Sequence, residues 1–190
     1  MNEIALKQEK NTSLLSWDTA EKHDLMRKTI ASTITNDEFQ LFLAIARSSG
    51  LDPFQKQIYA ISIKGKMVVI TAIDGYRAIA DRTERHMGTE GPYFKEDEKG
   101  NLISASIIIK KLVQGMIVNF DAVCFWDEYA PTYDGNVTGM WKKMQRTMLG
   151  KVTEALGLRR AFPSQLSGFY VKEEMDQSYE PAIQNKKNKI

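Results

Sequence analysis

Residues 139–163, GMWKKMQRTMLGKVTEALGLRRAFP, form the stretch around which we expect the rest of the chain to be organised. Apolar side chains recur there at steps of three and four, which is the period of an α-helix. The series runs Trp141, Met144, Met148, Val152, Ala155, with Leu156 beside it. Pro163 cannot continue a helix because its ring removes the backbone N–H. The pattern predicts one helix that ends before Pro163 and packs an apolar face against a core.

Positive charge gathers on another side of this predicted helix. At about 100° per residue, three cations fall on one flank and two more broaden it. These are Lys142, Arg146 and Arg160, with Lys143 and Lys151 beside them. Glu154 is the only acid in the stretch. Such a surface is either an ordinary solvated face or one that follows the phosphates of a nucleic acid.

Arg159 lies on the apolar face by the same angular count. A buried guanidinium without a partner is very costly, so this side chain requires an anion. Either a bound phosphate or a protein carboxylate would meet that requirement.

The composition is that of a soluble globular domain. The chain has 190 residues, of which 43% are hydrophobic and 26% charged, and its net charge is only +2. A nucleic-acid role must therefore depend on local clusters of charge. The single cysteine, Cys124, excludes an internal disulfide and fits a buried thiol in a reducing compartment. We find neither a membrane span nor a secretory signal, and expect a cytoplasmic protein of a bacterial host cell with no membrane partner.

We predict three regions: a flexible arm over 1–16, one domain over 17–176 and a disordered basic tail over 177–190. Helices are expected over 19–31, with Asp18 as the cap, and from the capping box Thr35–Glu38 to Gly50. Trp17 is expected to anchor the arm. Residues 57–63 and 67–73 read as strands, with Lys64, Gly65 and Lys66 at the hairpin tip.

Asp74 is expected to cap a helix over 75–86, and a loop is expected over 127–139. Further β signals cover 92–95, 102–112 and 117–126, a turn follows at 164–168, and a last short helix is expected at 171–175. The fold class is therefore α+β: an antiparallel or mixed sheet of about three to five strands packed with helices, with a basic helix near the C-terminal end.

The sequence offers no catalytic site. His23 and His86 lack metal-ligand spacing, and there is no glycine-rich phosphate loop. Asp74, Asp81 and Glu84 are the best candidates for holding a divalent ion, as in a metal-dependent nuclease. However, Asp74 and Asp81 fall on different sides of the predicted helix. We therefore predict no catalytic residue, no metal and no cofactor.

Three blocks of sequence resemble a known family. They are LDPFQKQIYAI, VVITAIDGYRAIADRTERHMG and the stretch quoted first, over about 50–88 and 139–163. Together they resemble the phage recombination protein Bet family (lambda Red beta), within the wider group that includes RecT. The resemblance implies a protein that anneals single-stranded DNA without ATP, binds the single strand and the nascent duplex, and assembles as a ring or helical filament.

The resemblance also implies which residues contact DNA. Lys56, Arg146 and Arg159 match basic family positions and are expected to contact phosphate, while Lys151 aligns less closely. Trp141 matches a family tryptophan and either stacks on bases or anchors the helix in the core. From charge alone we add Lys64, Lys66 and Arg77, together with Lys142 and Arg160 of the basic flank. Asp74, Gly75 and Tyr76 match a family motif that reads as architecture.

Two expectations stay open at this stage. A passive single-strand nucleic-acid binder without annealing activity fits the same residues. Family members usually continue into a region that recruits a partner exonuclease or a host single-strand-binding protein, so these are the expected protein partners. This chain ends 27 residues after Pro163, which leaves open whether it is naturally short or truncated.

Overall fold

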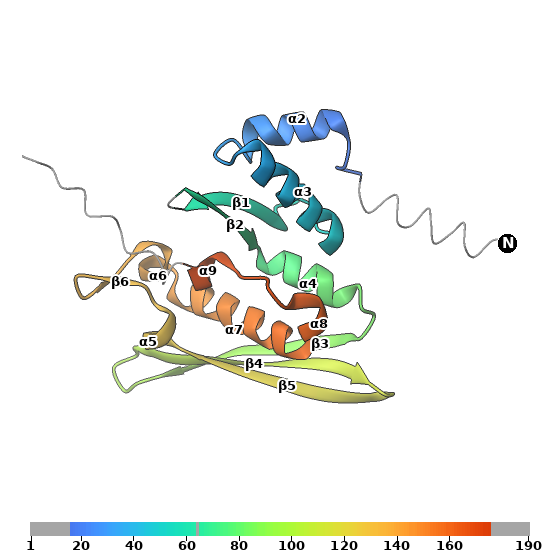
Figure 1. Cartoon of the computed structure of the whole chain (residues 1–190). Helices are drawn as coiled ribbons and strands as arrows, with labels where there is room; N and C mark the ends of the chain where they lie inside the picture. The colour runs from blue at the N-terminus through green and yellow to red at the C-terminus, as the bar shows by residue number, and fades with distance from the viewer. Residues whose placement is uncertain (1–15, 64, 176–190) are drawn as a thin grey trace, which may run out of the picture.

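The computed structural model describes residues 16–63 and 65–175. The predicted basic tail, Lys64 and all but the last residue of the predicted N-terminal arm lie outside these ranges. Within them the protein has the predicted α+β architecture, with antiparallel sheets and helices. Figure 1 shows the longest sheet as the lowest layer, one long helix lying over it, and the N-terminal helices above.

The first two helices follow their local capping signals. Helix α2 (Ala20–Thr29) has Thr19 as its N-cap, so the prediction that Asp18 caps it was wrong. Asp18 instead receives two hydrogen bonds of 2.7 Å from Arg47, which ties α2 to α3. Helix α3 (Asn36–Ser49) has the predicted capping box and ends at Gly50, whose φ of 62° is left-handed. Trp17 is buried beside these helices, as predicted.

A β-hairpin and a short helix follow. Strands β1 (Ile58–Ile63) and β2 (Lys66–Thr71) pair antiparallel across the predicted tip. Helix α4 (Ile73–Asp81) begins earlier than predicted, with Ala72 as N-cap. Asp74 therefore does not cap it; it lies inside the first turn and accepts a hydrogen bond from Arg77. The helix also ends before residue 86, because a long strand begins there.

The main sheet has the order β3-β4-β5 and is antiparallel. Its strands are β3 (His86–Glu96), β4 (Leu102–Val113) and β5 (Met116–Phe125). The last two confirm the predicted strands. Strand β3 is much longer than the four residues expected, because Gly88, Gly91 and three shifts of register interrupt its alternation. Cys124 is buried under the helical layer, as predicted.

The predicted loop over 127–139 contains short elements. Helix α5 (Trp126–Tyr129) is followed by β6 (Thr132–Tyr133) and β7 (Asn136–Val137). Helix α8 (Pro163–Leu166) occupies part of the predicted turn, with proline in its first turn. Helix α9 (Lys172–Met175) corresponds to the predicted last short helix.

The single long helix predicted over 139–163 is two helices. Helix α6 (Gly139–Lys143) and helix α7 (Gln145–Ala161) are separated by Met144, whose φ of −133° and ψ of 55° are not helical. Trp141 packs against Trp126 with ring centroids 5.6 Å apart, whereas α7 packs on β4 and β5. The break lets each segment follow its own partner. The continuous basic helix is therefore not confirmed, because Lys142 and Arg146 belong to different helices.

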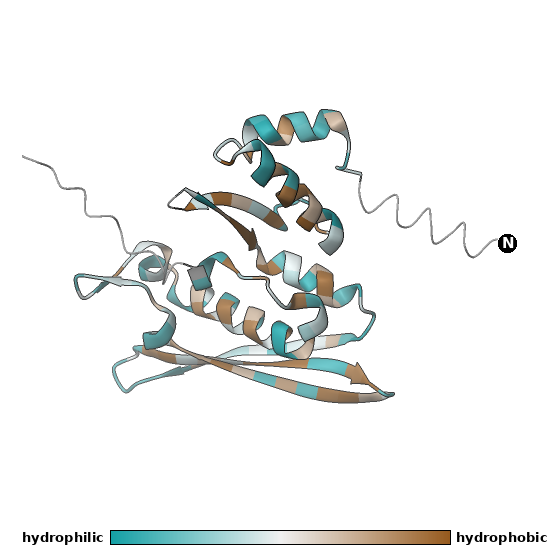
Figure 2. Ribbon diagram, in the orientation of Figure 1, coloured by the Kyte–Doolittle hydropathy of each residue, from teal (hydrophilic) through white to brown (hydrophobic). Residues whose placement is uncertain are grey.

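Helix α7 is the centre of the core. Ten of its residues are buried, including Glu154 and Thr153. A Cβ at Gly157 would lie 2.9 Å from Ile107 and 3.0 Å from Ile109, so this glycine allows α7 to approach β4 closely. Figure 2 shows apolar residues along the inner side of α7 and on the strands around it. Within the described residues, no helix is both long and apolar enough to cross a bilayer.

Candidate nucleic-acid interface

A groove of about 790 Å³ runs between the N-terminal elements and the helical layer of the main sheet. One wall comes from β1 and the start of α4, with Tyr59 and Arg77. The other comes from β3, α6 and α7. The short helix α9 closes part of it through Lys172 and Glu173. Four cations line the groove: Arg77, Arg146, Lys151 and Lys172.

Arg77 is held by a carboxylate that the sequence pattern placed at random on α7. Its Nε and an Nη atom each donate a 2.7 Å hydrogen bond to Glu154, and the other Nη donates to Asp74 at 2.9 Å. These bonds raise the pKa of Arg77 above its ordinary value, with Glu154 as the main cause. Glu154 has only 12% of its side chain exposed, whereas Arg77 has 48%. The pair joins α4 to α7 across the floor of the groove, and Arg77 keeps an open edge.

Arg146 lies where the groove continues into a second hollow of about 410 Å³. Its side chain is 62% exposed and forms an ion pair with Glu96 at the end of β3. Lys142 and Lys143 line this second hollow, as does Gln145, the first residue of α7. Helix α7 has no side-chain cap at its N-terminus, so its first N–H groups add positive potential beside these cations.

Two predicted DNA contacts lie under α9. Lys151 is 3.3 Å from Glu173, and Arg159 forms an ion pair with Glu174. Arg159 also donates to the Phe169 carbonyl and lies 5.6 Å from the Tyr170 ring. The anion that Arg159 requires is thus a protein carboxylate in this structure. Burial lowers the pKa of Arg159, but Glu174 outweighs it and leaves a raised value.

The segment that carries α9 is fixed by its backbone. The Tyr76 hydroxyl donates a 2.6 Å hydrogen bond to the Phe169 carbonyl, and the Thr71 N–H donates to the Tyr170 carbonyl at 3.0 Å. Val171 is fully buried. Tyr76 therefore has the architectural role that its motif suggested, because it secures the segment that places two acids over α7.

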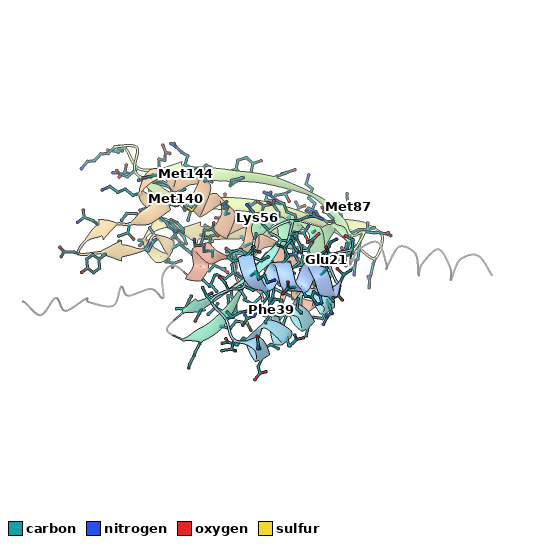
Figure 3. All side chains as sticks on the ribbon, turned by 90° about the horizontal axis from the view of Figure 1, so that it is seen from above. Glu21, Phe39, Lys56, Met87, Met140 and Met144 are labelled. Carbon is teal, nitrogen blue, oxygen red and sulfur yellow. The ribbon has the colours of Figure 1, made fainter. Side chains whose placement is uncertain are left out.

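Lys56 is presented by a compact turn. Asp52 accepts a 2.8 Å hydrogen bond from the Phe54 N–H, and the Lys56 N–H donates to the Pro53 carbonyl. Lys56 itself has a φ of 58° and is exposed. Figure 3 shows it beside the N-terminal elements, with Met140 and Met144 further along the other part of the molecule. The aspartate and proline of the LDPFQK block thus shape the turn that exposes this lysine.

The remaining predicted contacts are dispersed. Trp141 is 1% exposed and stacks on Trp126, so the structure gives it the core position. Lys66 is exposed at the start of β2, and Arg160 is exposed near the end of α7. Neither lines the groove. Lys64 lies outside the described residues.

The groove also contains residues that sequence reasoning did not select. Lys172, Tyr59 and Phe94 all line it. Tyr59 carried a signal, since it belongs to the LDPFQKQIYAI block. Lys172 and Phe94 lie outside the resembling blocks, and only the folded chain brings them to the groove.

The nuclease alternative gains no support from the described residues. They contain no group of three or more histidine, cysteine or carboxylate residues placed to hold a metal. Asp81 is 2.7 Å from His86, and Asp74 pairs with Arg77. These acids therefore act in local ion pairs.

Comparison with known families bears directly on this arrangement. The sequence model of the RecT family matches residues 16–189. This chain belongs to the RecT family. No curated protein sequence matches it. Membership in the RecT family implies single-strand annealing in phage recombination, with single-stranded DNA as the partner. RecT-family proteins are annealing proteins rather than known catalytic enzymes.

Proposed function

We propose that this protein anneals complementary DNA strands without ATP by binding the backbone of single-stranded DNA in the groove between β1, α4 and α7. The observation that carries the proposal is the convergence of Arg77, Arg146, Lys151 and Lys172 on one continuous hollow. Three elements supply these cations, so only the folded chain creates the site. Lys142 and Lys143 extend it beyond Arg146.

Backbone binding suits the chemistry of annealing. Contacts to phosphates carry no sequence information and leave the base edges free to pair. Tyr59 and Phe94 add aromatic surface to the groove, on which bases of any sequence can stack. A protein that grips the backbone and leaves bases accessible holds both the single strand and the nascent duplex. We propose that it does so as a homo-oligomer, either a ring or a helical filament.

DNA binding in this groove exchanges one anion for another. Arg146, Lys151 and Arg77 each pair with a carboxylate when no DNA is present. A phosphate oxygen replaces a carboxylate oxygen in each exposed pair at little net cost in charge. Glu154 is the exception, because it is nearly buried and holds Arg77 in place. The acids of α9 are the most easily displaced, since that helix has only four residues.

A passive single-strand binder is the second candidate, and the structure favours it nowhere over annealing. The two differ in one measurable property, since a passive binder protects strands without accelerating their pairing.

The groove is tested by removing its most exposed cations. The double variant Arg146→Ala/Lys151→Ala should weaken binding of a fluorescent single-stranded oligonucleotide by about ten- to a hundredfold at about 0.1 M salt, and reduce the salt dependence of the affinity. The matched control is Lys22→Ala/Lys28→Ala on α2, which removes the same charge away from the groove. Equal losses in both variants would mean that binding responds to net charge, and the groove assignment would fall.

A further inference from the structure

Two exposed apolar surfaces lie at opposite ends of the main sheet. The first is the tip of the β4–β5 hairpin, where Met116 is 66% exposed and Ile117 60%. Val118 beside them is 38% exposed. Figure 1 shows this hairpin reaching past the helices that cover the sheet, and Figure 2 shows its end coloured as hydrophobic. We call residues Met116, Ile117 and Val118 the hairpin tip.

The second surface lies on the face of the sheet that faces away from α7. Ala122 and Cys124 are buried under the helix, so Val123 and Phe125 point to the opposite face. Both are 45% exposed. Tyr93 is 56% exposed and pairs with Ser106, which in turn pairs with Val123. We call Tyr93, Val123 and Phe125 the sheet patch.

One chain cannot cover both surfaces with each other. Strand β5 runs from Met116 to Phe125, a distance of about 30 Å at about 3.4 Å per residue. Between the two surfaces the open face carries polar residues, with Lys110 paired to Asn119 across the strands and Asp121 next to them. Each apolar surface therefore needs a partner from outside the chain, or it stays in water.

The two ends also carry opposite charge. Lys110 and Lys111 precede the hairpin tip, and residues 110–119 contain no acid. Arg85 is held beside them by a 2.9 Å hydrogen bond to the Leu112 carbonyl. At the other end, the turn after β3 carries Glu96, Asp97 and Glu98, and Asp127 and Glu128 follow Phe125. The basic end and the acidic end are complementary, as expected for surfaces that meet.

We propose that the hairpin tip of one copy docks on the sheet patch of the next copy. Because different surfaces of the two copies meet, the contact is head-to-tail and repeats, closing as a ring or continuing as a helical filament. This proposal rests on the proposed function for its oligomer, and it names the surface through which that oligomer forms. The groove lies on the other side of α7 and remains open for DNA.

The test uses the full chain with one surface disabled at a time. Met116→Glu/Ile117→Glu disables the tip and places negative charge against the acidic end. Val123→Lys/Phe125→Lys disables the patch and places positive charge against the basic end. Light scattering of the wild type, with a single strand long enough for many copies, should show large assemblies, and each variant alone should remain monomeric. Asn119→Asp, on the same open face but in the polar region, is the matched control and should assemble like the wild type.

Mixing the two variants distinguishes head-to-tail contact from other modes. The mixture retains one intact tip and one intact patch, so it should form dimers that cannot grow. A mixture that stays monomeric would overturn the proposal, as would large assemblies formed by either variant alone, or a wild type that stays monomeric throughout. Circular dichroism verifies folding, and Tyr93→Lys replaces the patch variant if that variant unfolds.

A short oligonucleotide that holds one copy separates this proposal from the proposed function. Both variants should bind it as the wild type does, because neither touches the groove. If the wild type fails to bind it and yet the mixture gives dimers, the DNA groove is wrong and the interface stands. If binding is normal and the variants still assemble, the interface alone is wrong.

Discussion

At the scale of single residues, Arg77 and Glu154 connect two elements that are 77 positions apart in sequence. Removing the arginine leaves a nearly buried carboxylate without its cation, which is costly. We expect Arg77→Ala to lower the free energy of unfolding by about 1–3 kcal/mol, measured by urea denaturation. The double variant Arg77→Ala/Glu154→Gln should recover part of that loss. If Arg77→Ala is as stable as the wild type, the pair does not hold α4 on α7.

Asp18 makes a second residue-scale prediction, which concerns pH. Hydrogen bonds from Arg47 are the main cause that holds its pKa below the ordinary value of 3.8. A carboxyl whose pKa is lowered by folding stabilises the native state above that ordinary value, and the contribution is lost as the pH falls below it. Asp18→Asn should therefore cost about 1 kcal/mol at pH 7. The difference from the wild type should shrink below about pH 4, and a constant difference from pH 7 to pH 3 would contradict this.

At the scale of elements, local signals predicted local structure well. The Thr35–Glu38 capping box, the left-handed Gly50 and the hairpin between β1 and β2 all depend on neighbouring residues, and all three are confirmed. The break at Met144 could not be read this way, because the apolar period continues through it. What separates α6 from α7 is the contact of Trp141 with Trp126, and a helical period does not encode that contact.

The candidate site was partly predictable for the same reason. Arg77, Arg146 and Lys151 were selected from charge or resemblance, and the fold brings them to one groove. Lys172 was missed because nothing in the local sequence distinguishes it from a solvated lysine. The carboxylate partners were also missed, since pairs such as Lys151 with Glu173 form only when α9 folds back onto α7.

Helix α9 yields an element-scale prediction. Its two acids neutralise Lys151 and Arg159 before DNA arrives. Glu173→Gln/Glu174→Gln keeps the size of both side chains and removes their charge, so single-strand affinity should rise by about two- to tenfold. Glu21→Gln/Glu98→Gln is the control, because it removes the same charge from exposed sites elsewhere. Unchanged affinity together with a lower melting temperature would show that α9 is purely structural.

The packing of α7 on the sheet gives another prediction. Alanine favours helices over glycine by about 1 kcal/mol, but a methyl at position 157 would press on Ile107 and Ile109. We expect Gly157→Ala to destabilise the protein by about 1–3 kcal/mol, since both isoleucines are fully buried and have little room to move. Thermal unfolding measures this directly. A more stable variant would mean that the sheet yields to the helix.

At the scale of the whole molecule, the fold separates two tasks. One side of α7 meets α4 and β1 and forms the cationic groove, while the other covers the sheet whose outer face and hairpin tip stay open. DNA binding and assembly therefore use different surfaces, so copies can join without blocking the groove. An annealing protein benefits from this arrangement, because a row of aligned grooves holds a strand extended with its bases free to pair.

The most direct test of the central claim is the rate at which two complementary fluorescent oligonucleotides pair in the presence of the protein, without ATP. The wild type should accelerate pairing, the Arg146→Ala/Lys151→Ala variant should lose most of that acceleration, and the Lys22→Ala/Lys28→Ala control should keep it. If the wild type binds the strands but leaves pairing unchanged or slower, the protein is a passive single-strand binder and the annealing account is contradicted.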